Sequence, residues 1–292
     1  MYTKNKSLPF FIILFELLSF ICCPSKECVC KVTDIPLSFL DNKSAYVPLT
    51  IDNNDFFLLL DIGSFSSITI NKRYSRHLKI KKTGIVKSHL GVKGTVHQSD
   101  EVIFPNVALG SLKLGNIKGF IDSDWLDSGM IIHGKNSLSS PRNNGVIGRS
   151  LLKKLKIIID LRNEKLILAD TISDLEKIGY FINEWPLINF YNTDIGIELD
   201  VKVNNKKGRF ILDTGASHSL LRKTFFNEKD IDSQIDFFKA DNLQIKNIDY
   251  PNFDFILLNF EQPAEVDGIL GIDFFKGKMI FLDMQTNIIK IN

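Results

Sequence analysis

The residues Phe210-Ile211-Leu212-Asp213-Thr214-Gly215-Ala216-Ser217 carry the strongest structural signal in this 292-residue sequence. An apolar run ends abruptly in an acid, a hydroxyl residue, a glycine and two small residues, and the chain becomes apolar again at Leu220-Leu221. The pattern predicts a strand, a tight loop and a second strand, because the glycine permits a sharp turn and the close approach of another backbone. The carboxylate of Asp213 is therefore expected at a strand end.

A second glycine-bracketed apolar segment, Asp267-Gly268-Ile269-Leu270-Gly271-Ile272-Asp273-Phe274-Phe275, lies near the end of the chain and could pack beneath the first loop. Asp-Thr-Gly alone also occurs in ordinary β-turns, so the argument depends on the two segments together. Together they resemble the aspartic proteases of the pepsin and retropepsin superfamily. Lobes of that superfamily pair an Asp-Thr/Ser-Gly loop with an apolar-apolar-Gly segment.

The first half of the chain repeats these landmarks in the same order. The corresponding segments are Pro36-Leu37 with Phe39 and Pro186-Leu187 with Phe190, then 58–64 (LLLDIGS) and 210–217, then 145–148 (GVIG) and 268–271 (GILG), then 157–160 (IIID) and 280–283 (IFLD). Twelve positions separate Gly148 from Asp160, and the same number separates Gly271 from Asp283. We interpret this agreement as an internal duplication.

The duplication and the resemblance together imply the fold class and the domain boundaries. The expected fold is mostly β, with two retropepsin-like β-barrel lobes in a pepsin-like bilobal arrangement. Residues 35–169 are predicted to form the N-terminal lobe with its flap, 170–184 a linker, and 185–292 the C-terminal lobe.

The N-terminus has the features of a targeting segment. Residues 1–24 combine a basic start with a short apolar stretch, which is typical of a secretion signal or anchor. Residues 25–34 are interpreted as a cysteine-containing tail. We therefore expect a protein that is exported or anchored to a membrane through this N-terminus.

Composition excludes several classes of function. The formal net charge is only +2, which offers no overall electrostatic case for a nucleic-acid partner. The four cysteines, Cys22, Cys23, Cys28 and Cys30, all lie near the N-terminus. A catalytic thiol in the body of the protein is thus excluded, and Cys28-Val29-Cys30 lacks the second ligand pair of a zinc site.

Two carboxylates can hydrolyse a peptide bond without a metal or a cofactor, and we expect neither. Carboxylates about 3 Å apart cannot both ionise, so they share one proton. The ionised member takes a proton from water while the protonated member polarises the scissile carbonyl. Such a pair titrates as a unit.

The resemblance assigns roles to individual residues. Asp213 matches the catalytic acid of the family, and Asp61 is the candidate for its partner. The residues expected to support the two acid loops are Gly63, Ser64, Thr214, Gly215 and Ala216. Ile62 departs from the pattern, since the family has Thr or Ser there, with a hydroxyl that bonds across to the other lobe. Ser64 matches a position from which family members hydrogen-bond the carboxylate, so an asymmetric acid pair is expected.

A hairpin at Ser88–Val96 has glycines near its tip and is placed as the flap by its position. The predicted substrate-binding residues of the flap are Gly91, Val92, Lys93 and Gly94. No tyrosine occurs between Tyr74 and Tyr180, so the glycine-rich retropepsin flap is the closer match.

The resemblance implies an aspartic endopeptidase that acts on polypeptides as a monomer. One alternative is a peptide-binding module that keeps the protease fold but has lost cleavage through Ile62. A further alternative builds the active site from two copies of Asp213 in a dimer of second lobes.

Overall fold

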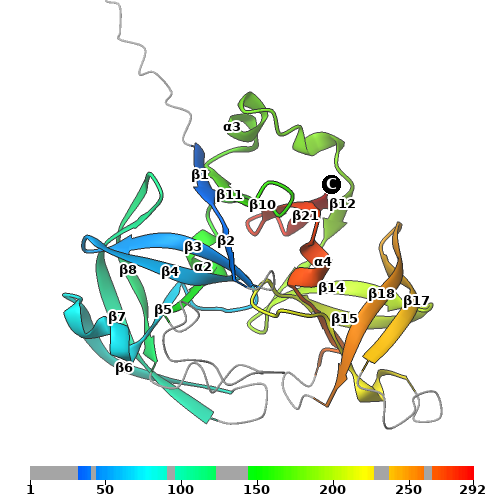
Figure 1. Ribbon diagram of the computed structural model, residues 1–292, viewed down its shortest axis with the longest axis horizontal. Coiled ribbons are helices and arrows are strands. Elements are labelled where there is room, and N and C mark those ends of the chain that lie inside the picture. Colours follow the sequence, from blue (N-terminus) through cyan, green and yellow to red (C-terminus); the bar gives the residue numbers. More distant parts are fainter. Residues whose placement is uncertain (1–31, 41–43, 91–95, 123–143, 227–236, 260–264) are drawn as a thin grey trace, which may run out of the picture. The chain divides into compact units, whose positions relative to one another are not determined.

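The computed structural model describes residues 32–40, 44–90, 96–122, 144–226, 237–259 and 265–292. Strands dominate these residues, and they form two barrels and one further sheet that both halves of the chain share (Figure 1). The expected fold of mostly β structure in two similar barrels is confirmed.

The first barrel is a closed ring of six strands. In ring order they are β3 (Ser44–Ile51), β4 (Asn54–Asp61), β9 (Gly145–Gly148), β5 (Ile68–Asn71), β8 (Leu112–Asp122) and β7 (Val96–Leu109). Pairing of Thr50 with Ala108 and of Ile51 with Val107 joins β3 to β7 and closes the ring. Two further strands, β2 (Ser38–Leu40) and β6 (Lys81–Leu90), extend the sheet at its ends, and the 3-10 helix η1 (Lys72–His77) follows β5.

The second barrel repeats this ring. Its strands are β14 (Ile197–Val203), β15 (Lys206–Leu212), β19 (Gly268–Leu270), β16 (Leu220–Arg222), β18 (Ile248–Leu258) and β17 (Phe237–Ile245). The β14–β17 pairing closes it, β13 (Tyr191–Asn192) pairs with β14, and the 3-10 helix η4 (Lys223–Phe225) follows β16. The two rings match strand for strand, as the duplication predicts.

The third sheet joins the two halves. Its order is β1 (Val32–Pro36), β11 (Lys165–Ala169), β10 (Lys156–Asp160), β20 (Met279–Asp283), β21 (Ile288–Ile291) and β12 (Leu187–Asn189). The central strands β10 and β20 run antiparallel, with Ile158 opposite Phe281. Each half contributes three strands, so a pseudo-twofold axis passes between β10 and β20.

The strand register corrects one detail of the repeat. The N–H of Leu37 donates to the carbonyl of Glu164, and the N–H of Phe190 donates in the same way to Asn287. Leu37 therefore corresponds to Phe190. The match of Pro36-Leu37 with Pro186-Leu187 is three residues out of register, because a strand as short as β12 carries too few side chains to fix its alignment by pattern.

Both faces of the shared sheet are covered. Ile157 and Ile159 of β10 point into the main core, whereas Ile158 packs in a second cluster on the other face. Residues 170–184, expected as a linker, supply part of that cluster through α3 (Ile172–Lys177) and the 3-10 helix η3 (Ile182–Glu184). Leu175 and Ile182 are fully buried there.

Two short helices follow the apolar-apolar-Gly segments. They are α2 (Arg149–Leu152) after β9 and α4 (Ile272–Phe275) after β19. Across the described ranges, no helix has the length and apolar character needed to cross a membrane. The predicted signal 1–24 lies outside the described residues, as does most of the predicted tail 25–34, whose last three residues belong to β1.

Candidate active site

Each acid follows the last apolar residues of a barrel strand. Asp61 ends β4, and its loop is closed by the N–H of Ser64, which lies 2.8 Å from Oδ1 of Asp61. Asp213 follows β15, and the N–H of Gly215 lies 2.7 Å from its Oδ1. The apolar-apolar-Gly segments run parallel beside these strands, so that Leu60 is paired with Ile147 and Leu212 with Leu270. A buried strand on each side thus fixes where each carboxyl emerges.

The two loops meet closely and reciprocally. A Cβ atom added at Gly63 would lie 2.6 Å from Cγ of Asp213, and one added at Gly215 would lie 2.6 Å from Cγ of Asp61. Distances this short exclude any side chain at either glycine. The carboxyl groups of Asp61 and Asp213 are hydrogen-bonded to each other. The structure therefore brings both predicted acids and both predicted glycines together at one point.

Burial raises the pKa of both acids, although solvent still reaches part of each residue. For Asp61 the pKa lies well above its ordinary value because of burial, then the negative charge of Asp213 and the hydrogen bond to it. For Asp213 burial raises the pKa, and hydrogen bonds oppose that rise. Their donors are Asp61 and the N–H groups of Gly63, Gly215 and Ala216. More main-chain N–H groups therefore donate to Asp213 than to Asp61, and these bonds favour the ionised form of Asp213.

The hydroxyl of Thr214 links the two lobes. It donates to the carbonyl of Leu60 at 2.7 Å and accepts from the N–H of Ile62 at 3.1 Å. Thr214 is fully buried. The pseudosymmetric position is Ile62, whose side chain is also fully buried but packs in the hydrophobic core and has no hydroxyl to return the bond. The link therefore runs in one direction, from the second lobe to the first.

Ser64 supports its loop differently from expectation. Its N–H donates to Asp61, whereas its hydroxyl lies 2.9 Å from the hydroxyl of Ser66. Ala216, at the equivalent place in the second loop, uses its carbonyl to accept the N–H of Ile272 at 2.8 Å. The better hydrogen-bonded acid is Asp213, which owes this to main-chain donors rather than to a side chain.

Arg149 is a residue of this site that sequence reasoning missed. It is the first residue of α2, it is only 3% exposed, and its guanidinium lies 2.8 Å from the carbonyl of Gly63. The only signal in the sequence was a single cation directly after the buried segment at 145–148, a place where charge is costly unless it has partners.

Comparison with known proteins agrees with this architecture. No protein-family model matches the sequence, and no curated protein matches it. Among solved structures, the crystal structure of an aspartic proteinase from Irpex lacteus superposes with a TM-score of 0.57. The fold is that of a pepsin-like aspartic proteinase. The superposition covers 89% of this chain and 96% of that chain at 11% sequence identity, so the likeness concerns the fold.

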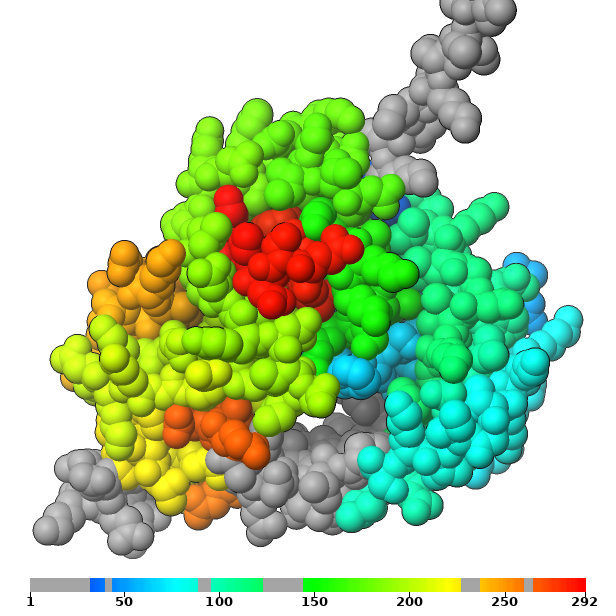
Figure 2. Space-filling view, turned by 180° about the vertical axis from the view of Figure 1, so that it is seen from behind, coloured from blue at the N-terminus to red at the C-terminus, as the bar shows by residue number. Residues whose placement is uncertain are grey.

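The predicted flap residues Gly91, Val92, Lys93 and Gly94 lie outside the described residues. The hairpin that leads to them is present in the pepsin-like first barrel, where β6 and β7 pair up to Leu90 and Val96. Ile85, Val86 and Val96 are exposed on this hairpin. Figure 2 shows the molecule hollowed between the first barrel, in cyan, and the second barrel, in yellow and orange.

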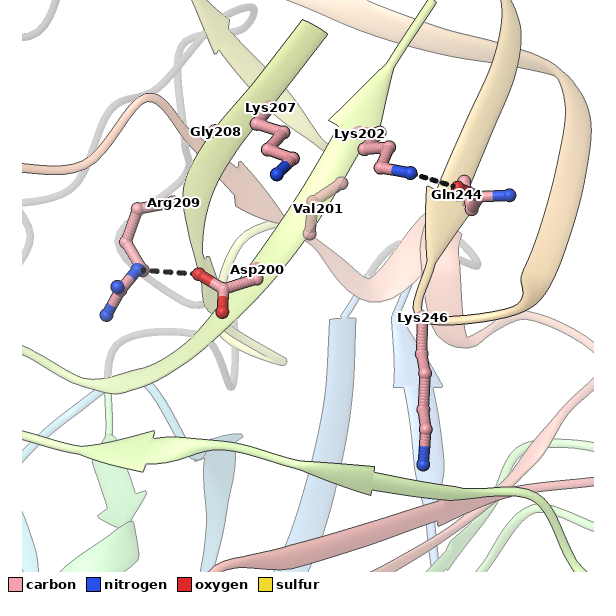
Figure 3. A pocket seen from close by; sticks show the side chains of 8 residues that line it. All are labelled: Asp200, Val201, Lys202, Lys207, Gly208, Arg209, Gln244 and Lys246. Atoms are coloured by element: carbon pink, nitrogen blue, oxygen red, sulfur yellow. Dashed lines mark hydrogen bonds and ion pairs between the residues drawn. The ribbon is translucent and has the colours of Figure 1, made fainter. Parts of the chain in front are cut away.

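A separate cavity of about 500 Å³ lies on the second barrel, away from both acids (Figure 3). It is lined by Asp200, Val201, Lys202, Lys207, Gly208, Arg209, Gln244 and Lys246. Three of its cations have partners within the protein, since Arg209 pairs with Asp200, Lys202 bonds Gln244, and Lys246 bonds a carbonyl. Asp200 is the single acid among these lining residues, so the cavity has no pair of carboxyl groups for hydrolysis.

Proposed function

We propose that this protein is an aspartic endopeptidase in which Asp61 and Asp213 activate one water molecule. The observation that carries the proposal is the reciprocal approach of the two acid loops, which puts two carboxyl groups in hydrogen-bond contact within a single chain. The pepsin-like fold supports it. We further propose a polypeptide substrate, a monomeric enzyme and export through the N-terminal segment.

The asymmetry of the pair suggests how the reaction starts. Asp213, ionised, accepts a proton from the water, whose oxygen attacks the carbonyl carbon of the peptide bond. Asp61, protonated, donates its proton to the carbonyl oxygen, which gives a neutral tetrahedral diol. Asp213 then returns its proton to the amine nitrogen while Asp61 takes one from a diol hydroxyl, and the C–N bond breaks. The original protonation state is restored.

The raised pKa values bear on the working pH. Cleavage requires one proton on the pair, and that proton is lost only when the pH rises through the raised pKa of Asp61. Activity is therefore expected to persist at a higher pH than it would for two unperturbed aspartic acids.

A second candidate is a peptide-binding module with no cleavage. The observation in its favour is Ile62, whose apolar side chain replaces one of the two hydroxyls that tie the family's lobes together. The dimer of second lobes has less support, since Asp213 already meets a carboxyl from its own chain.

Incubation of the purified protein with a diverse peptide mixture at pH values from 3 to 8, followed by mass spectrometry, tests the proposal. Cleavage by the wild type, absent from Asp213→Asn and from samples with a pepstatin-type inhibitor, is the expected result. Peptide binding without cleavage at any pH supports the second candidate. Full activity of Asp213→Asn contradicts the endopeptidase proposal. Size-exclusion chromatography of the active fraction separates monomer from dimer.

A further inference from the structure

Arg149 is a buried cation whose guanidinium is held by main-chain carbonyl groups. Nη1 lies 2.8 Å from the carbonyl oxygen of Gly63, and Nη2 lies 2.7 Å from that of Thr193 and 3.0 Å from that of Asp194. Burying an arginine is expensive unless its donors are satisfied. Three carbonyl acceptors satisfy both Nη atoms in part, and they also fix the position of the guanidinium.

The three carbonyls belong to different lobes. Gly63 lies in the loop of Asp61, whereas Thr193 and Asp194 lie between β13 and β14 of the second lobe. The second-lobe acceptor is itself restrained, because the N–H of Thr193 donates to Gly196 at 3.0 Å and the N–H of Gly196 donates back to the Thr193 hydroxyl at 3.3 Å. Arg149 thus connects the first acid loop to a fixed turn of the opposite lobe.

The two lobes differ at two related positions. Ile62 stands opposite Thr214 in the pseudosymmetry, and Arg149, directly after Gly148, stands opposite Ile272, directly after Gly271. The lobe that lacks the hydroxyl is therefore the lobe that carries the arginine. Thr214 ties the second lobe to the first, and Arg149 ties the first lobe to the second.

We propose that Arg149 is a positioning residue that holds the Asp61 loop against the second lobe and so replaces the inter-lobe tie missing at Ile62. This inference rests on the proposed function. Arg149 acts through the carbonyl of Gly63, the residue whose Cα lies against the Asp213 carboxyl, so a shift of this loop changes the distance between the acids.

The charges around the site are consistent with a second effect of Arg149. The charged groups that act on the guanidinium are Asp61, Asp194 and Asp213. The positive charge of Arg149 lowers the pKa of Asp61, against the larger effects of burial and of Asp213, which raise it. The ring of Phe65 lies 5.3 Å from the guanidinium carbon. Although 56% exposed, Phe65 therefore has a partner in the site, a cation over an aromatic face.

Substitutions at Arg149 separate the effect of its inter-lobe hydrogen bonds from the effect of its charge. Arg149→Met removes both, and Arg149→Lys keeps the charge but loses the fork that reaches two lobes. Arg222→Met is the matched control, since the Arg222 guanidinium also donates to a main-chain carbonyl, that of Val266, but within one lobe. Each variant is measured for kcat and KM against pH on a peptide that the wild type cleaves, and for its unfolding midpoint.

For Arg149→Met we expect kcat to fall roughly 10- to 100-fold with a smaller change in KM, as a loosened catalytic geometry would cause. Because a cation that favours the ionised acids is gone, both limbs of the pH profile should move to higher pH. Arg149→Lys should lower kcat and leave the limbs in place. Arg222→Met should keep the kcat and the pH profile of the wild type.

A double-mutant cycle tests the replacement of the missing hydroxyl. Ile62→Thr supplies a hydroxyl at the position equivalent to Thr214, so it should restore part of the kcat lost in Arg149→Met. The inference is overturned if Arg149→Met keeps the wild-type kcat and pH profile, or if Ile62→Thr changes kcat by the same factor with and without Arg149.

NMR of the carboxyl carbons follows the titration of the two acids without a substrate, so it tests the role of Arg149 separately from the proposed function. The titration of Asp61 and Asp213 should move upward in Arg149→Met whether or not a substrate has been found, and an unchanged titration contradicts the inference. A wild type that cleaves nothing, with a shifted titration in the variant, contradicts the proposed function and leaves the placement of Arg149 supported. If Arg149→Met does not fold, Arg149→Lys decides. A lower kcat in that variant supports the inference, and a wild-type kcat contradicts it.

Discussion

The hydroxyl of Thr214 donates to the carbonyl oxygen of Leu60 across the lobe boundary at 2.7 Å. The same hydroxyl accepts the N–H of Ile62 at 3.1 Å, so one side chain satisfies two main-chain groups of the opposite lobe. All three residues are fully buried, and water cannot replace these bonds if the hydroxyl is removed.

Replacing Thr214 by valine should therefore destabilise the protein. The shape of the side chain is kept, but a buried N–H and a buried carbonyl lose their partner, at a cost of about 1–3 kcal/mol. Denaturant unfolding measures the loss. Thr214→Ser keeps the hydroxyl and serves as the control, and equal stability of the valine and serine variants would show that the hydroxyl is not what links the lobes.

Alanine at Gly63 should abolish activity. Its Cβ would fall 2.6 Å from Cγ of Asp213, so the two acid loops must separate. Gly277→Ala is a useful comparison, because it carries backbone strain at φ +68° yet its Cβ meets no atom within 4 Å. A peptide-cleavage assay should find activity in Gly277→Ala and none in Gly63→Ala, and normal cleavage by Gly63→Ala would contradict the described approach of the loops.

Asp61→Asn should stabilise the protein at neutral pH while it removes activity. Folding raises the pKa of Asp61, chiefly through burial, so the folded state binds a proton more tightly than the unfolded state. That contribution to stability is complete below the ordinary pKa of 3.8 and is lost as the pH rises through the raised pKa. The wild type should therefore lose unfolding free energy from about pH 4 upward.

The asparagine variant should show a smaller slope and a higher melting temperature at pH 7, by about 2–4 °C for each kcal/mol gained. Asp241→Asn, at an exposed position of β17, is the control for the loss of one carboxylate. A wild-type slope in Asp61→Asn would mean that Asp61 does not take up a proton on folding.

Asp283→Asn should destabilise the shared sheet. Asp283 of β20 and Lys156 of β10 form an ion pair of 2.6 Å between the two halves of the chain, with side chains only 4% and 13% exposed. Burial raises the pKa of Asp283, but hydrogen bonds from Lys156, Thr286 and Gln285 outweigh it and lower the pKa overall.

Removal of one partner of a buried pair costs about 3–5 kcal/mol. Because the folded pKa of Asp283 is lowered, its contribution is present above the ordinary value of 3.8 and is lost as the pH falls through the folded pKa. Unfolding measured at pH 7 and pH 3 should thus show a larger effect of Asp283→Asn at pH 7. An equal effect at both values would contradict the pairing. Asp34→Asn is the control, since the side chains of the Asp34–Lys165 pair are 49% and 43% exposed.

Much of the architecture could be predicted because duplication leaves the same residues at the same spacing. Each catalytic candidate follows an apolar strand. Gly148 and Gly271 are each followed twelve positions later by an acid of the shared sheet. These features can be recognised in the sequence because the strand end, the glycine and the carboxylate lie close together along the chain. The position of each acid at a strand end followed from these features, whereas the two barrels followed from the resemblance to the pepsin and retropepsin superfamily.

Contacts between distant residues could not be predicted. The acceptors of Arg149 are 86, 44 and 45 positions away in the chain, and no periodicity relates them. The role of 170–184 was obscured for a similar reason, because Leu175 and Ile182 become part of a core only against distant residues of the shared sheet such as Phe281. The alignment of the two halves at β12 was out of register because the pattern of three residues is too short to fix it.

The central claim is that Asp61 and Asp213 act as one unit, and a kinetic cycle of Asp61→Asn, Asp213→Asn and the double variant tests it most directly. Acid-base catalysis of this kind contributes about 10²–10⁴-fold, and a unit that needs both members is lost with either. We predict that kcat/KM falls by nearly the same factor in each single variant and in the double variant. Losses that multiply in the double variant, or full activity in Asp61→Asn, would contradict the account.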